Sequence, residues 1–106
     1  MYENVIREEL QNCREILADI FQSGLIAVSD SLLDRLKSEA LTVSQYGMKW
    51  LSDQIDALYK QLESRRHTLA ETDDAETVRL FCMIDRYLEI GIRQTELDEA
   101  VRRFSI

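Results

Sequence analysis

The chain contains no proline and only three glycines among its 106 residues. Proline breaks helix interiors and glycine marks helix ends, so few places exist where a long helix can be interrupted. Runs of β-branched residues and a period-two alternation of apolar and polar residues, which would indicate strands, are also missing. The sequence therefore predicts an all-α fold.

Four segments of the chain carry apolar residues at spacings of three and four, the pattern of a helix with one buried face. Gly24, Gly47 and the polar, acidic linker HTLAETDDAET separate these segments. We predict helices near residues 2–22, 30–46, 48–66 and 74–104. A chain of this length is most simply one domain, so we expect residues 1–106 to form a compact antiparallel four-helix bundle built from αα-hairpins.

Local signals for helix ends support these boundaries. Gly24 suits the left-handed position just past the first helix, and Leu25 can fold back on Ile20. Ser29 then offers an N-cap for the second helix. The acidic linker before the last helix offers three more candidate caps, namely Thr72, Asp73 and Asp74. Asp73 has capping-box spacing to Glu76.

Gly47 allows two architectures. In the first, it ends one helix and Met48 folds back on Val43, which gives a tight αα-hairpin. In the second, a single helix runs from Ser29 to Arg66, because the apolar spacing continues through Gly47. That helix would be about 57 Å long at 1.5 Å per residue, which is long for so small a domain. We favour the hairpin, although no good N-cap follows Gly47.

Gly91 poses the same question in the last helix, because the apolar phase slips after Ile92. The apolar residues beyond the slip are Leu97, Val101 and Phe104. Thr95 and Asp98 have capping-box spacing and would suit the start of a short fifth helix. We favour one continuous helix, kinked or straight, over that division.

The charge of the chain argues against several classes of function. Thirteen basic and twenty acidic side chains give a net charge of −7. A surface of this sign repels a phosphate backbone, so we do not expect nucleic acid as a partner. No window is apolar enough to span a membrane, and the acidic start MYENVIREEL lacks the features of a signal peptide. We therefore expect a cytoplasmic protein with no membrane partner.

Residue types that carry catalysis or bind metals are sparse. Cys13 and Cys82 have no CxxC spacing and no further cysteine beside them, so they indicate buried reduced thiols. His67 is the only histidine, and together with Glu63 it supplies too few ligands for a zinc site. The glycines form no phosphate-binding loop. We predict no enzyme activity, no catalytic residue, no cofactor and no metal.

An aromatic flank on the third segment is the candidate binding site. Trp50 lies one position off the apolar stripe of residues 51–62, and Tyr46 lies one turn before it. Such aromatics can simply cap the core. If they are partly exposed together with Met48 and Ala57, they form an anchor of the kind that protein interfaces favour. We predict that a protein partner or a second copy, giving a homodimer, contacts these four residues.

The stretch GLIAVSDSLLDRLKSEALTVSQYGMKWLSDQIDAL has a glycine–leucine start, a leucine-rich helix, a glycine and a second leucine-rich helix. In this pattern residues 24–62 resemble a helical segment of bacterial proteins that carry SWIM-type zinc fingers. The resemblance implies an accessory helical domain of a bacterial protein. Cys13, Cys82 and His67 cannot supply the spacing of the SWIM zinc ligands, so no zinc or nucleic-acid function is carried over.

The sequence thus predicts a small, acidic, non-enzymatic helical module that acts through protein–protein contacts or regulation. Two alternatives belong to other classes. A helix-turn-helix nucleic-acid binder could span residues 36–62 with Gly47 in its turn, and it would need a basic stripe on its surface. An acidic helical chaperone or adaptor would need a continuous apolar groove.

Overall fold

The computed structural model describes residues 2–25, 27–67 and 74–105. These residues form four helices and no strand. The helices are α1 (Tyr2–Ser23), α2 (Asp30–Gln45), α3 (Lys49–Arg66) and α4 (Ala75–Phe104). Each observed end lies within one residue of the expected one, so the all-α four-helix fold is confirmed.

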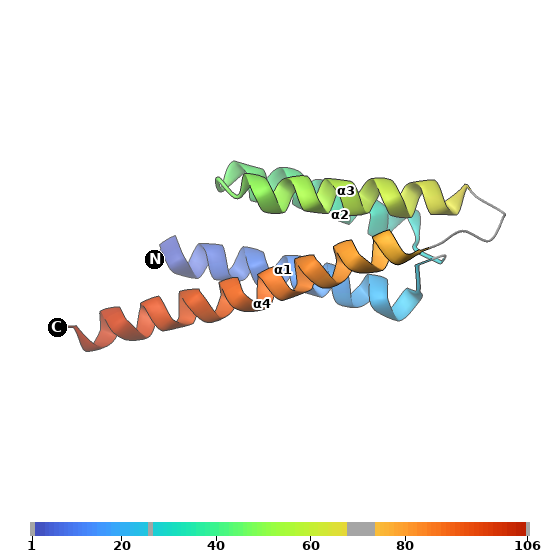
Figure 1. The fold of residues 1–106 in the computed structure, drawn as a ribbon. Coiled ribbons are helices and arrows are strands. Elements are labelled where there is room, and N and C mark those ends of the chain that lie inside the picture. Colours follow the sequence, from blue (N-terminus) through green and yellow to red (C-terminus); the bar gives the residue numbers. More distant parts are fainter. Residues whose placement is uncertain (1, 26, 68–73, 106) are drawn as a thin grey trace.

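The helices form an up-down-up-down bundle in which each helix is antiparallel to the next (Figure 1). The contacts of α2 with α3 and of α1 with α4 are the most extensive, and smaller contacts join α3 to α4 and α1 to α2. The bundle is elongated, with extents of 60 × 22 × 21 Å. The C-terminal part of α4 runs past the start of α1 and projects from one end of the bundle (Figure 1).

One apolar core runs along the bundle axis, and every helix contributes to it. Its largest fully buried side chains are Leu17 and Ile20 of α1, Leu36 and Val43 of α2, Leu51, Ile55, Leu58 and Leu62 of α3, and Ile84 and Leu88 of α4. Burial of each such side chain contributes about 1.5–3 kcal/mol to folding. The helical spacing of apolar residues therefore identifies the core faces up to Ile92, whereas Leu97, Val101 and Phe104 lie outside the core.

Gly47 ends α2, which confirms the hairpin. Its φ of +83° lies in the left-handed region, where the Cβ of other residues crowds the backbone. Glycine has no Cβ and adopts this conformation without strain. The Gly47 N–H donates to the Ser44 carbonyl and the Met48 N–H donates to the Val43 carbonyl, each at 3.0 Å. These are the two hydrogen bonds of a Schellman motif, and Met48 packs against the core as expected.

The start of α3 has the weak cap that the sequence indicates, because Met48 occupies the N-cap position without a side-chain hydrogen bond. Contacts between the two helices hold the hairpin closed instead. The Ser52 hydroxyl donates to the Ala40 carbonyl at 2.7 Å near the turn. At the open end of the hairpin, Arg66 forms an ion pair with Asp30.

The other expected caps have different outcomes. The Leu32 N–H donates to the Ser29 hydroxyl at 3.1 Å, which confirms the cap of α2. Asp74 occupies the N-cap position of α4 without a side-chain cap bond, and its carboxylate lies 3.0 Å from Arg65 Nε instead. Thr72 and Asp73 lie outside the described residues.

Gly91 lies inside α4, so the continuous helix is confirmed and no fifth helix begins there. Thr95, a candidate cap for such a helix, is buried, and its hydroxyl donates to the Ile92 carbonyl at 2.7 Å. The reason for a glycine at position 91 is the neighbouring helix. A Cβ at this position would lie 3.0 Å from Leu10 Cδ1 on α1, so glycine permits the close approach of α1 to α4.

Candidate functional site

The four residues of the expected binding flank lie at the α2–α3 turn and along α3. Met48 and Ala57 are half-buried and pack against the core, and Tyr46 is half-buried at the C-cap of α2. Trp50 is the exposed member, with 44% of its surface accessible. Its ring centroid lies 4.8 Å from that of Tyr87 on α4, so the flank borders α4. Contact of these residues with a partner stays a prediction.

A longer apolar surface lies on α4 itself, and we call it the outer stripe. Its members alternate between three and four positions apart, which places them on one face of the helix. The stripe consists of Tyr87, Ile90, Gln94, Leu97, Val101 and Phe104, all of them exposed. Exposure rises along the stripe from 37% at Tyr87 to 86% at Phe104.

The outer stripe faces away from the bundle. The buried residues of α4 are Thr77, Leu80, Ile84, Leu88, Ile92 and Thr95. At about 100° per residue, the centre of the outer stripe lies about 130° around the helix from the centre of this buried face. The slip of the apolar phase after Ile92 therefore marks a change of face. Spacing would have revealed the stripe, because Leu97 and Val101 keep helical phase with Tyr87 and Ile90.

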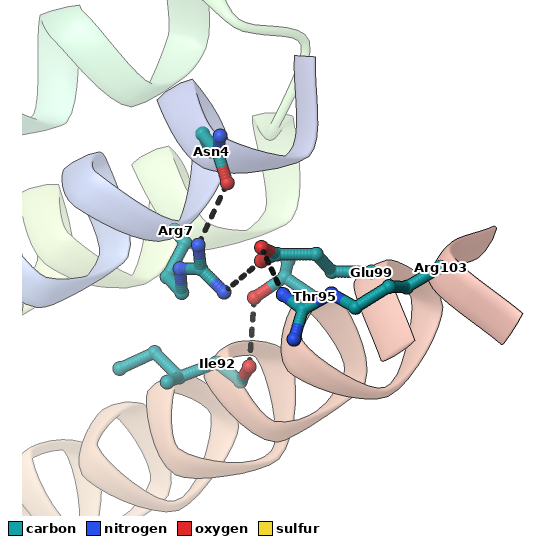
Figure 2. A network of polar contacts seen from close by, with 6 residues as sticks. All are labelled: Asn4, Arg7, Ile92, Thr95, Glu99 and Arg103. Carbon is teal, nitrogen blue, oxygen red and sulfur yellow. Dashed lines mark hydrogen bonds and ion pairs between the residues drawn. The ribbon is translucent and has the colours of Figure 1, made fainter. Parts of the chain in front are cut away.

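A polar network fixes the orientation of α4 about its own axis, near the part of the helix that projects from the bundle. Figure 2 shows Arg7 of α1, whose Nη2 donates to Asn4 Oδ1 at 2.7 Å and whose Nη1 lies 2.6 Å from Glu99 Oε2. Arg103 Nη2 lies 3.1 Å from the other Glu99 oxygen. The hydrogen bond from Arg7, together with its charge, lowers the pKa of Glu99.

This network fixes which way the stripe points. Glu99 is two positions from both Leu97 and Val101, so its side chain leaves α4 about 160–200° away from theirs. Because Arg7 binds Glu99 against α1, the two apolar side chains are turned to solvent. The projecting part of α4 is therefore anchored on one side and apolar on the other.

A second apolar feature lies near the opposite end of the α1–α4 pair. Phe21 is 76% exposed, and its ring centroid is 6.2 Å from that of Phe81. The two rings border an apolar cavity of about 270 Å³, which is also lined by Ile20, Gly24, Leu25, Val78 and Cys82. The expectation that both cysteines are buried is wrong for Cys82, whose thiol is exposed because its position on α4 lies at this rim.

A buried carboxyl group between α1 and α2 is a feature that the sequence analysis missed. Glu39 is buried, and its Oε1 has no hydrogen-bond partner among the described residues. Burial, followed by a side-chain hydrogen bond with the Glu9 carboxyl of α1 and the charge of Glu9, raises its pKa to about 8. Arg35 acts in the opposite direction. At neutral pH the Glu39 carboxyl therefore keeps its proton.

Burial also raises the pKa of the thiol of Cys13 on α1. Cys13 is fully buried, and burial, followed by the charges of Glu39 and Glu9, raises its pKa to about 12. A protonated, enclosed thiol is a poor nucleophile. The spacing of Glu39 could have revealed the site, since it lies three residues after Leu36 on the buried face of α2.

Metal-binding clusters and membrane-spanning helices are both absent from residues 2–25, 27–67 and 74–105. No group of three or more His, Cys, Asp or Glu side chains in those ranges could hold a metal ion. His67 is exposed at the C-cap of α3. Within the same ranges, no helix has both the length and the apolar content to cross a membrane.

Comparison with known proteins identifies no relative, since no family model, no curated protein and no solved structure matches the chain. The resemblance of residues 24–62 to SWIM-containing proteins therefore stays a prediction. The geometry of α4 and its neighbours is the remaining basis for a functional assignment.

Proposed function

We propose that this chain is a non-enzymatic protein-interaction module whose binding surface is the outer stripe of α4. The supporting observation is the uneven distribution of exposed apolar side chains. Six of the ten exposed large apolar residues in the described part of the chain lie on α4, and five of these six belong to the outer stripe. The stripe is about 26 Å long at 1.5 Å per residue. Contiguous apolar surfaces of this kind mark interaction sites.

The aromatic flank expected from the sequence adjoins this surface. Trp50 contacts Tyr87, which is the first member of the outer stripe. Tyrosine and tryptophan are enriched at interfaces because a large apolar body carries a polar tip. The proposed binding surface therefore has Trp50 at its edge and Leu97 and Val101 at its centre.

A non-enzymatic role is supported by where the unusual titratable groups lie. Glu39 and Cys13 carry the most strongly raised pKa values, and both are buried at the interface of α1 with α2. Cys13 is fully buried there, out of reach of a substrate. Free thiols at Cys13 and Cys82 support a reducing compartment, so we keep the cytoplasm as the proposed location.

The helix-turn-helix alternative has weaker support. α2 and α3 lie antiparallel and side by side (Figure 1), whereas the helices of that motif cross at about 90–120°. The lysines of α3 are also offset by acidic neighbours. Lys49 Nζ lies 3.5 Å from Asp53 and Lys60 Nζ lies 3.0 Å from Asp56. Such a helix presents little net positive charge to a phosphate backbone.

A capture experiment with matched variants tests the proposal. The double variant Leu97→Asp/Val101→Asp places charge in the outer stripe, and Leu41→Asp places charge on α2 at a residue that is 64% exposed. We expect wild type and Leu41→Asp to retain the same proteins from a lysate of the parent cell, a second copy of the chain included. The double variant should lose them. If it retains all of them while its helical content is unchanged, the proposal is wrong.

A further inference from the structure

We propose that the partner of the outer stripe is a second copy of this chain, bound parallel and in register through α4. The inference rests on the proposed function and names its partner. It is carried by three features of α4: the heptad spacing of the stripe, the charges beside it and the one polar residue within it.

The outer stripe has the spacing of a two-stranded coiled-coil seam. Its steps of three and four residues repeat every seven, with Tyr87, Gln94 and Val101 at one seam position (a) and Ile90, Leu97 and Phe104 at the other (d). Two helices with this pattern interlock their apolar side chains along a shared seam. The core face of α4 is already occupied, so this second face needs a partner from outside the bundle.

The charges beside the seam select the parallel orientation. Arg93 and Asp98 are the charged residues at the flanking g and e positions around the Gln94–Leu97 step. In a parallel pair, the g residue of one heptad faces the e residue of the next heptad on the second helix. Arg93 would therefore meet Asp98 of the second copy, and the twofold axis makes this contact twice.

An antiparallel pair gives no such contact. With apolar residues still matched along the seam, Arg93 would face Ala100 of the second copy and Asp98 would face Gly91. Arg93 is well exposed and now lies 3.1 Å from Glu89 of its own helix, so it can reach outward without unpacking the core. Only the parallel pair therefore brings the opposite charges of Arg93 and Asp98 together across the seam.

Gln94 favours the same arrangement. Its side-chain amide now donates to Asp98 Oδ1 at 2.9 Å on the exposed face. In the parallel pair, the two Gln94 amides meet across the seam, where each can donate to the other. In the antiparallel pair, each amide would face Leu97, and a buried amide without a partner is costly. A polar residue at one seam position commonly fixes register in this way.

α4 is already folded in the bundle, and its seam residues Leu97 and Val101 are exposed to a second copy. Arg7 of α1 binds Glu99 on the face of α4 opposite the seam, so α1 leaves the seam open around Leu97 and Val101. Leu10 of α1 contacts Gly91, which flanks the seam one heptad before Asp98. Because packing already forms α4, association does not have to order it. The seam spans about two and a half heptads. This is smaller than a standard interface, so we expect a dissociation constant in the micromolar range.

Sedimentation or light scattering across the micromolar range measures the association directly. We expect wild type and Leu41→Asp to convert from monomer to dimer, whereas Leu97→Asp should remain monomeric with unchanged helical circular dichroism. Wild type that stays monomeric throughout overturns the inference. The proposed function would still stand in that case if the stripe variants lost captured proteins, and it would fail separately if they lost none.

Single cysteines report the orientation. Cys82→Ser removes the exposed thiol, and Val101→Cys or Ile90→Cys then introduces one in the seam. In the parallel pair, position 101 faces itself, so Val101→Cys should form a disulfide-linked dimer on mild oxidation. In the antiparallel pair, two copies of position 101 are about 16 Å apart along the axis and position 101 faces position 90. Linkage only between Ile90→Cys and Val101→Cys chains would overturn the parallel arrangement.

Charge reversal tests the flanking pair. Arg93→Asp and Asp98→Arg each set like charges against each other in a homodimer, and we expect each to weaken dimerisation about tenfold. An equimolar mixture of the two variants restores both opposite-charge contacts and should form heterodimers with affinity near that of wild type. Arg86→Asp is the control, because position 86 faces Gly91 in the parallel pair. A mixture that associates no better than its components, or an equal loss in Arg86→Asp, overturns the assignment of the pair.

Discussion

Gly91 of α4 lies directly against Leu10 of α1, close enough that a Cβ at position 91 would be 3.0 Å from Leu10 Cδ1. Alanine is favoured over glycine in a helix interior by about 1 kcal/mol. The contact opposes that gain, because Leu10 is buried and has little room to move. The crossing of α1 over α4 thus depends on a residue that is unfavourable for the helix itself.

This conflict predicts a coupling between the two positions. In the wild-type background, we expect Gly91→Ala to change the free energy of unfolding by less than the helix gain. In a Leu10→Ala background the obstructing methyl group is absent, so the same substitution should stabilise by about 1 kcal/mol. Urea unfolding of wild type, the two single variants and the double variant gives the coupling free energy between the two positions. An equal effect in both backgrounds would show that the contact does not constrain position 91.

Gly47 is sensitive for a different reason. Its φ is +83° and no atom lies within 4 Å of an added Cβ, so substitution is opposed by backbone conformation alone. We expect Gly47→Ala to lower the free energy of unfolding by about 1–2 kcal/mol, and Gly47→Asn to lower it by less. Thermal unfolding compares the two variants. A Gly47→Ala protein as stable as wild type would contradict the left-handed turn.

These two glycines show what sequence could and could not predict. The Gly47 turn is local: glycine, an apolar residue and the preceding helix are within six positions of one another, so the Schellman motif could be predicted. Gly91 and Ile92 form the same local pattern inside a helix. The difference lies in Leu10, about eighty positions away in sequence, and no spacing rule reaches that far.

The candidate site was missed for a related reason. Helical spacing shows that an apolar face exists, but it does not show whether the face meets the same chain or another one. Leu97 and Val101 continue an apolar pattern beyond the core, and only the packing of Arg7 on Glu99 shows that they point outward. Glu39 was missed because it is a carboxyl group within the otherwise apolar buried face of α2.

Glu39 should make the stability of the bundle depend on pH. Its pKa is about 8 in the folded protein, against an ordinary value of 4.5 for the exposed carboxyl of the unfolded chain, so the folded state binds the extra proton between these values. The free energy of unfolding therefore falls as pH rises from 4.5 to about 8, by at most about 1.4 kcal/mol per pH unit. The contribution is complete below pH 4.5 and lost above pH 8.

The variant Glu39→Gln carries no titrating proton and should abolish this dependence. Urea unfolding across the same pH range compares it with wild type and with Glu8→Gln, which changes an exposed carboxylate on α1. We expect Glu39→Gln to be the more stable protein near pH 8. If the wild-type and Glu39→Gln curves run parallel, the buried carboxyl is not protonated in the folded state.

The two cysteines should differ in reactivity. Cys82 is exposed, whereas Cys13 is buried with its pKa raised to about 12. A maleimide at neutral pH should therefore modify Cys82 rapidly in the folded protein and Cys13 only after unfolding, because the thiolate is the reacting species. Mass spectrometry of the native and urea-denatured chain counts the adducts. Equal rates at the two thiols in native buffer would contradict the burial of Cys13.

Trp50 joins the aromatic flank to the outer stripe and can report on both. It is the only tryptophan, and its ring lies 4.8 Å from Tyr87 at an interplanar angle of 43°. An aromatic pair of this kind contributes about 0.5–1.5 kcal/mol, so we expect Trp50→Ser to lower the free energy of unfolding by an amount in that range or slightly above it.

Trp50 borders the seam only at its first residue, so the same variant should weaken self-association far less than Leu97→Asp does. Light scattering of the two folded variants at equal concentration makes the comparison. A Trp50→Ser protein that is monomeric where wild type is dimeric would place the centre of the interface on α3, at the flank indicated by Tyr46, Met48, Trp50 and Ala57.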